Sequence, residues 1–321
     1  MIEVQNVSKT YPTGIRANHS ISFTVEQGEI VALVGPNGSG KTTLMQQMLG
    51  VLKIGEGSIR IDGEENNTQN IAYIPQTPAI YPALTVRESL LAITKYLGVP
   101  KKEAAERIDR VLEKTGLSRN ARQPAYTLSG GQRKLLSFGC MLVQEAKNLV
   151  MDEVTSMVDV VTKEHIWQLI LDEQKRGCAI LLSSHDISEV KKLCTKLVVL
   201  QKGSIIFSGS PHEVRNEYCR CTIQVDNAIQ AKTILNETDC SYTHEGNDFS
   251  IVTQDITQML KLLHELTKTV NIGSFSCEHP AFYDGLLSML KNQGGKLICC
   301  TPSAPVCGST SKTFASSCCN I

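Results

Sequence analysis

The positions of apolar and polar residues along the chain predict strands that alternate with helices. Ile30–Val34 is a run of five apolar residues that ends at a glycine, which is typical of a strand buried on both faces in a parallel sheet. Helical patterns cover residues 41–52 and most of residues 86–140. Strands separated by helices predict an α/β fold with a parallel sheet, into which the long helical stretch is inserted. Further strand patterns lie at residues 4–7, 21–25, 58–62, 71–74, 149–151, 179–182, 197–200 and 204–207.

The pattern changes after Pro211. Strand-like and helical segments follow one another in the order β-α-β-β-α-β from residue 222 to residue 275. This order predicts a small α+β unit that is compatible with a ferredoxin-like arrangement. Residues 280–292 have the pattern of one amphipathic helix, and the residues beyond them have no periodicity.

Composition limits the class of protein. The chain has 321 residues, a length that corresponds to about two domains. Lys plus Arg and Asp plus Glu both number 32, so the net charge is zero and binding to nucleic acid is not expected. The sequence has neither an apolar run of the roughly 18 residues that span a membrane nor a leader pattern at its start. We therefore expect a soluble protein made in the cytoplasm.

The chain is rich in cysteine, with 12 residues. Cys140, Cys178 and Cys194 lie in apolar or mixed stretches and are expected to be buried as small apolar side chains. Residues 293–321 are rich in Cys, Ser and Thr and poor in apolar residues, which predicts a disordered tail. A fused peptide substrate, a metal site and a prenylation signal are weaker alternatives for this tail.

A glycine-rich loop is predicted between the third strand and the first helix. Gly35–Thr42 reads Gly-Pro-Asn-Gly-Ser-Gly-Lys-Thr and matches the pattern G-x-x-x-x-G-K-[ST]. Its glycines allow successive backbone N–H groups to point at an anion, and the following helix N-terminus adds free donors. Lys41 can reach the outer phosphates, and the Thr42 hydroxyl can bind Mg²⁺. The loop therefore predicts a phosphate site.

Two carboxylates follow a predicted buried strand. Leu149, Val150 and Met151 are apolar and lead directly into Asp152 and Glu153. Ligands of α/β sheets bind at the carboxyl ends of the strands. We expect Asp152 to hold Mg²⁺ and Glu153 to polarise an attacking water as a general base.

Taken together, these segments resemble the ATP-binding cassette (ABC) family, the nucleotide-binding subunits of ABC transporters. Leu128–Gln132 reads Leu-Ser-Gly-Gly-Gln and is similar to the signature motif of that family. The resemblance covers about residues 1–215, and four further motif positions follow in the family's order: the aromatic Tyr11, the Q-loop Gln76, the D-loop Asp159 and the switch histidine His185.

The resemblance implies a role for each motif. Glu153 and His185 would be catalytic, and Mg²⁺ would be bound by Thr42, Gln76 and Asp152. ATP would be bound by two sets of residues. The set from one subunit is Tyr11, Gly35, Pro36, Asn37, Gly38, Ser39, Gly40, Lys41, Thr42, Thr43, Gln76 and Asp159. The set from the signature segment is Ser129, Gly130, Gly131 and Gln132, which acts on the ATP of a second subunit.

The resemblance also implies an architecture. Residues 1–215 would form an α/β P-loop NTPase cassette, with a RecA-like parallel sheet, an antiparallel β part and a helical subdomain at about residues 84–145. Residues 216–292 would form a small α+β accessory domain, similar to the extra domain of export-type cassettes. The implied assembly is a homodimer or heterodimer of cassettes on a separate transmembrane permease subunit, at the inner face of the cell membrane.

The sequence departs from the family pattern beside the catalytic carboxylate. Val154 stands where the family usually has proline, and Met157-Val158 stands where it usually has Gly-Leu. Neither change removes a charged or donor group, so ATP hydrolysis is expected to survive. The implied function is an ATPase that powers transport. Export is the expected direction, and a drug or peptide is the expected substrate. The alternative is a soluble ATP switch that regulates a partner protein or nucleic acid.

Overall fold

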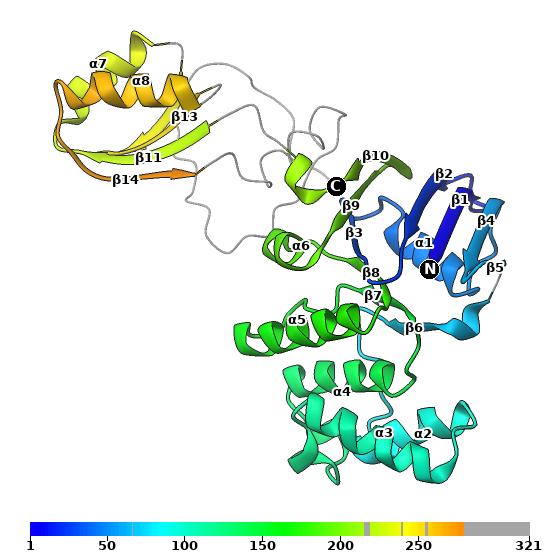
Figure 1. The fold of residues 1–321 in the computed structure, drawn as a ribbon. Helices are drawn as coiled ribbons and strands as arrows, with labels where there is room; N and C mark the ends of the chain where they lie inside the picture. Colours follow the sequence, from blue (N-terminus) through cyan, green and yellow to red (C-terminus); the bar gives the residue numbers. More distant parts are fainter. Residues whose placement is uncertain (66, 215–218, 239, 254–255, 279–321) are drawn as a thin grey trace.

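The computed structural model describes residues 1–65, 67–214, 219–238, 240–253 and 256–278. Within these residues, a six-stranded sheet has the strand order β10-β9-β3-β8-β7-β6. Neighbouring strands are parallel except for the antiparallel hairpin of β9 and β10. The predicted α/β fold with a parallel sheet is therefore confirmed (Figure 1). The strands are β3 (Ile30–Val34), β6 (Ile71–Ile74), β7 (Asn148–Asp152), β8 (Ala179–Ser183), β9 (Lys196–Gln201) and β10 (Ser204–Gly209).

The central strands of this sheet are buried on both faces. Every residue of β3 is buried, and its side chains alternate between two hydrophobic clusters. Ala32 joins the cluster that contains Leu136 of the helical face, whereas Leu33 joins the cluster that contains Leu44 of the opposite face. Because each fully buried Val or Leu contributes about 1.5–3 kcal/mol, the continuous apolar run of β3 anchors the loop that follows it.

A second, antiparallel sheet covers one side of the molecule. Its strand order is β2-β1-β4-β5, and it packs with α1 (Lys41–Met48) into the cluster that contains Leu44. Helix α1 ends before the predicted residue 52 because Gly50 has a φ of +70°, outside the helical region. The strands are β1 (Ile2–Thr10), β2 (Arg16–Val25), β4 (Glu56–Ile61) and β5 (Glu64–Glu65).

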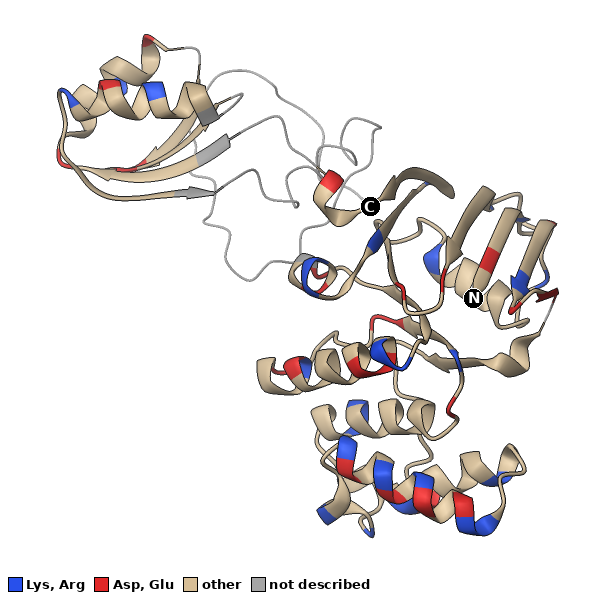
Figure 2. Ribbon diagram, in the orientation of Figure 1, with Lys and Arg blue, Asp and Glu red and all other residues tan. Residues whose placement is uncertain are grey.

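Helices cover the other face of the six-stranded sheet. Thr85 begins the predicted helical insertion with a capping box, in which Thr85 and Glu88 satisfy each other's backbone N–H groups. Figure 2 shows basic and acidic residues interleaved along the ribbon of α3, as expected of a helix with a face open to solvent. The helices are α2 (Val86–Tyr96), α3 (Lys101–Lys114), α4 (Gly130–Leu142), α5 (Val160–Lys175) and α6 (Ile187–Leu193), with short 3₁₀ turns η1 (Thr68–Asn70), η2 (Ser118–Asn120), η3 (Ala125–Thr127) and η4 (Pro211–Glu213).

The C-terminal residues build a separate antiparallel sheet with the order β12-β13-β11-β14. Helices α7 and α8 pack on this sheet through a cluster that includes Ile223, Phe249 and Leu262. The chain order β-α-β-β-α-β with these neighbours is that of a split βαβ unit. The elements are β11 (Cys219–Val225), α7 (Ala228–Asn236), β12 (Ser241–Glu245), β13 (Asp248–Thr253), α8 (Ile256–Thr267) and β14 (Ile272–Glu278).

Three further sequence predictions concern membrane-spanning helices, the burial of cysteines and the structure of residues 280–321. None of the helices in the described ranges is long and apolar enough to cross a bilayer. Cys178 and Cys194 are buried as predicted, whereas Cys140 is only partly buried. The helix predicted at residues 280–292 and the tail at residues 293–321 lie outside the described residues.

Candidate functional site

The glycine-rich loop lies between the end of β3 and the start of α1. Gly40 is the residue before the helix and has a φ of +103°, a conformation that favours glycine. A Cβ at this position would lie 2.3 Å from the carbonyl oxygen of Ala17. The loop therefore needs glycine at residue 40 for two reasons, the backbone conformation and the close approach of the β2 segment.

Lys41 and Ser39 give the inside of this loop its polarity. Lys41 is buried, and its Nζ donates to the carbonyl oxygens of Gly35 at 2.7 Å and Pro36 at 3.2 Å. Burial lowers the pKa of Lys41, and the nearby charges of Glu153 and Asp152 partly oppose this shift. The buried Ser39 Oγ has no hydrogen-bond partner among the described residues. Free donors beside a buried ammonium group fit the oxygens of a phosphate chain.

Asp152 lies at the carboxyl end of β7, next to the start of α1. Its Oδ2 is 3.3 Å from Thr42 Oγ1, and its Oδ1 accepts a hydrogen bond from Ser183 Oγ at 2.5 Å. Mg²⁺ in phosphate sites takes one or two carboxylates together with hydroxyl, water and phosphate oxygens. The oxygens of Thr42 and Asp152 therefore fit a Mg²⁺ site.

Glu153 is the centre of a chain of hydrogen bonds. Its Oε2 accepts from Gln76 Nε2 at 2.7 Å, and its Oε1 lies 2.7 Å from His185 Nε2. Glu153 has a φ of +47°, an uncommon conformation for a residue other than glycine. The carboxyl ends of the adjacent strands β6, β7 and β8 thus bring together three residues that are far apart in the sequence.

Most of the predicted phosphate-binding residues line a cavity of about 560 Å³. Tyr11 lines it, and its hydroxyl lies 3.2 Å from Thr43 Oγ1. Sequence reasoning missed Arg16 and Lys202, which bring two more cations to the same cavity from β2 and from the β9–β10 turn. A single Arg or Lys in a turn has no pattern that separates it from a solvated charge. The remaining lining residues are Ile15, Ala17, Asn37, Gly38, Ser39, Gly40, Lys41, Thr42, Gln76 and Glu153.

The signature segment starts helix α4 and is not among the residues that line this cavity. Ser129 is the N-cap of α4, and its side chain and that of Gln132 form a capping box. A Cβ on Gly131 would lie 2.8 Å from Thr162 Oγ1 on α5, so glycine allows α4 to approach the D-loop of its own chain. This helix end is therefore separate from the cavity at the glycine-rich loop.

Asp159 in the D-loop has a structural partner. It is the N-cap of α5 and accepts hydrogen bonds from the backbone N–H and the hydroxyl of Thr162. These bonds lower the pKa of Asp159. In the same loop, Met157 is fully exposed with a φ of +58°, whereas Val154 is buried. The loop therefore projects an apolar side chain where the family pattern has glycine.

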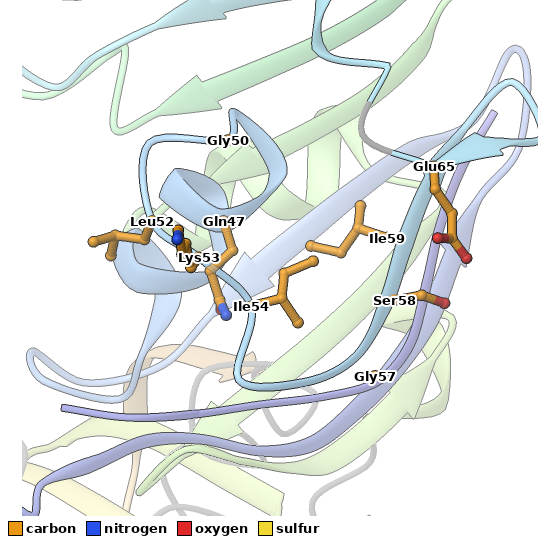
Figure 3. A pocket seen from close by; sticks show the side chains of 9 residues that line it. All are labelled: Gln47, Gly50, Leu52, Lys53, Ile54, Gly57, Ser58, Ile59 and Glu65. Atoms are coloured by element: carbon orange, nitrogen blue, oxygen red, sulfur yellow. The ribbon is translucent and has the colours of Figure 1, made fainter.

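A second cavity, of about 350 Å³, lies between the end of α1 and strand β4. Figure 3 shows Gln47, Lys53 and Ile54 close together at one side of it and Ser58 and Glu65 at the other. None of the predicted site residues lines it. Both amide atoms of Gln47 are buried away from solvent and have no partner among the described residues, so they are not open to a ligand in this cavity.

Comparisons with known proteins identify the same segment of the chain. The sequence profile of the ABC transporter family matches residues 18–156. The energy-coupling factor transporter ATP-binding protein EcfA of Methanothermobacter thermautotrophicus is 33% identical over 225 residues, which are 67% of this chain and 72% of that protein. The Nod factor export ATP-binding protein I of Sinorhizobium fredii is 33% identical over 228 residues, 69% of this chain and 66% of that protein.

A solved structure supports the same assignment. The dimeric structure of a post-hydrolysis state of an ATP-binding cassette, bound to ADP and Pi, is 25% identical in sequence. It superimposes with a TM-score of 0.60 over 65% of this chain and 98% of that chain. The fold, the phosphate loop and these relatives agree, and the chain therefore belongs to the ATP-binding subunits of ABC transporters, ATPases that power transport through separate membrane subunits.

Proposed function

We propose that the cavity at the glycine-rich loop binds ATP with Mg²⁺. Lys41 and the loop from Gly35 to Thr43 hold the phosphates, and Tyr11 stacks on the adenine. Thr42 and Asp152 bind Mg²⁺, with Gln76 as a further ligand, and the metal supplies Lewis-acid polarisation of the phosphate oxygens when it is bound. The buried, unpartnered Ser39 Oγ and the 3.3 Å separation of Thr42 and Asp152 support this assignment.

Hydrolysis requires a base beside the γ-phosphate. Glu153 accepts a proton from the attacking water, the water oxygen bonds to the γ-phosphorus, and the bond from that phosphorus to the bridging oxygen of ADP breaks. His185 holds Glu153 and contacts the γ-phosphate. The observation that supports this proposal most directly is the position of the Glu153 carboxylate. Its oxygens lie 2.7 Å from Gln76 Nε2 and 2.7 Å from His185 Nε2.

The site is completed in a dimer of cassettes. Ser129 to Gln132 lie outside the cavity of their own chain, so we place them against the ATP of a second cassette. The second cassette is another copy of this chain or a related cassette. The dimeric cassette with ADP and Pi supports this arrangement.

The transported compound is exported, and the cassette dimer is peripheral to the inner face of the cell membrane. The relative named for Nod factor export supports the direction, while the relative named as an energy-coupling factor protein does not distinguish it.

Residues 1–215 form the cassette, with a helical subdomain at about 84–145. Residues 216–292 form an accessory domain that supports or regulates the dimer. Drugs and peptides are the expected substrate classes.

The test of the catalytic assignment is Glu153→Gln. Its steady-state ATPase rate is expected to fall by about 100- to 10,000-fold because the general base is lost. ATP binding and ATP-dependent dimerisation, measured by light scattering, are expected to persist. Glu164→Gln is the matched control, since Glu164 is an exposed carboxylate on α5 that pairs with Lys192 at 3.4 Å. Full activity of Glu153→Gln would contradict the assignment.

A further inference from the structure

A buried carboxylate lies directly behind the catalytic loops. Glu189 belongs to the first turn of α6, and only 2% of its surface is exposed. A buried carboxylate is costly unless it is fully hydrogen-bonded or paired with a cation. The contacts of Glu189 therefore indicate what its charge is used for.

Three side chains donate to Glu189. Its Oε1 accepts from Thr155 Oγ1 and from Trp167 Nε1, both at 2.8 Å. Its Oε2 accepts from Ser184 Oγ. The indole N–H can only donate, and the two hydroxyls are directed at the carboxylate as donors. Glu189 therefore accepts at both of its carboxylate oxygens, whereas an amide in its place could accept at only one of its two terminal atoms.

The hydroxyl donors come from the two loops that carry the catalytic residues. Thr155 lies two residues after Glu153, at the end of β7, and Ser184 directly precedes His185, at the end of β8. Glu189 therefore ties together the two segments whose spacing sets the 2.7 Å contact between Glu153 and His185.

Two lysines lie over the ring of Trp167, one of the donors to this carboxylate. The Nζ atoms of Lys163 and Lys192 lie 5.0 and 4.6 Å from the ring centre of Trp167, which itself donates to Glu189. Lys163 also pairs with Asp186, the N-cap of α6. The α6 N-terminus and the three donors stabilise negative charge at this position.

We propose that Glu189 is a positioning residue for ATP hydrolysis, which holds the loop after Glu153 and the loop before His185 at the spacing that catalysis requires. Glu189 is not among the residues that line the cavity at the glycine-rich loop. This inference rests on the proposed roles of Glu153 and His185. A misplacement of about 1 Å in a catalytic group can lower the rate by about 100-fold, so a loss of this tie should reduce turnover rather than ATP affinity.

The experiment measures kcat and KM for ATP in Glu189→Gln and Thr155→Val. Glu189→Gln keeps the volume but replaces one accepting oxygen with an NH₂ group and removes the charge, and its kcat is expected to fall by about 10- to 100-fold with KM changed less than about twofold. Thr155→Val removes one donor at nearly constant shape, and a smaller fall of about 3- to 10-fold is expected. Asp172→Asn is the control, because Asp172 is an exposed carboxylate on the same helix as Trp167.

Two results would overturn the inference. The first is a kcat of Glu189→Gln equal to that of the wild type. The second is a fall in kcat that matches the fall in the fraction of protein able to bind ATP, because unfolding alone would then explain the lost activity. Thr155→Val provides the second measurement if Glu189→Gln does not fold. If Glu153→Gln is inactive while Glu189→Gln is fully active, only this inference fails. If Glu153→Gln is active, the proposed function fails first.

Discussion

Lys134 Nζ donates a hydrogen bond to the main-chain carbonyl oxygen of Gln76 at 2.6 Å. Lys134 lies on α4, the helix that begins after Ser129, and Gln76 follows β6 and donates to Glu153. Burial lowers the pKa of Lys134, and the charges of Glu153 and Asp152 partly oppose that shift. The helix that carries the signature segment thus also holds the Q-loop of its own chain.

Replacing this lysine should weaken that link. Lys134→Met removes a charged donor, and such hydrogen bonds contribute about 1.5 kcal/mol at the lower end, so kcat is expected to fall about tenfold with little change in KM for ATP. Steady-state ATPase measurements over a range of ATP concentrations test this. Lys102→Met is the control, because Lys102 is an exposed cation on α3. Equal kcat values for the two variants would show that the contact with Gln76 has no influence on turnover.

The phosphate loop should be intolerant of a methyl group at Gly40. Gly40→Ala combines an unfavourable positive φ with a Cβ 2.3 Å from the Ala17 oxygen, and we expect a loss of about 1–3 kcal/mol in unfolding free energy together with weaker ATP binding. Gly63→Ala separates the two causes, since Gly63 has a φ of +85° and open space around its Cβ position. Denaturant titrations should give a larger loss for Gly40→Ala. Similar losses would mean that the contact with Ala17 relaxes freely.

Complementation should reveal whether two copies of the chain share their sites. Lys41→Met disables the phosphate loop and Ser129→Arg disables the signature segment, so each variant alone is expected to be inactive. In an equimolar mixture, half of the dimers contain one intact site, and about a quarter of the wild-type ATPase rate is expected for a symmetric homodimer. No recovery in the mixture would indicate that the second cassette is a different chain.

The ion pair of Asp186 with Lys163 should be visible in the pH dependence of stability. Burial alone would raise the pKa of Asp186, but hydrogen bonds from Lys163 and Ser188 lower it overall. A carboxylate with a lowered folded-state pKa stabilises the fold above its ordinary value of about 3.9, and this contribution is lost as the pH falls through the lowered pKa.

Asp186→Asn keeps the cap on α6 but loses the charge. Its melting temperature is therefore expected to lie below that of the wild type near neutral pH, and the difference should shrink as the pH falls below about 3.9. Thermal unfolding followed by circular dichroism at several pH values measures this. A difference that stays constant into acid would mean that the charge of Asp186 does not stabilise the fold.

Sequence reasoning succeeded where local pattern determines structure. The run Ile30–Val34 is a fully buried strand, and the glycines that follow form a loop at a helix start, because both features depend on neighbouring residues alone. The end of α1 was placed too late because apolar spacing continued past Gly50. Helices α5 and α6 were not singled out by the sequence pattern.

The contacts between distant residues could not be predicted. Gln76, Glu153 and His185 meet only because β6, β7 and β8 are neighbours in the sheet, and the strand order is not written in any one segment. The partners of Lys134 and Glu189 were missed for the same reason. Each is a charged residue in an amphipathic helix, and such a residue usually faces solvent.

Trp167 is the one tryptophan in the chain, and its indole is hydrogen-bonded to the carboxylate that joins the two catalytic loops. Its ultraviolet emission therefore comes from a single place, beside the carboxylate that contacts the loops after β7 and β8. The protein carries its own optical probe, with no dye or engineered label needed to follow how these loops respond to nucleotide.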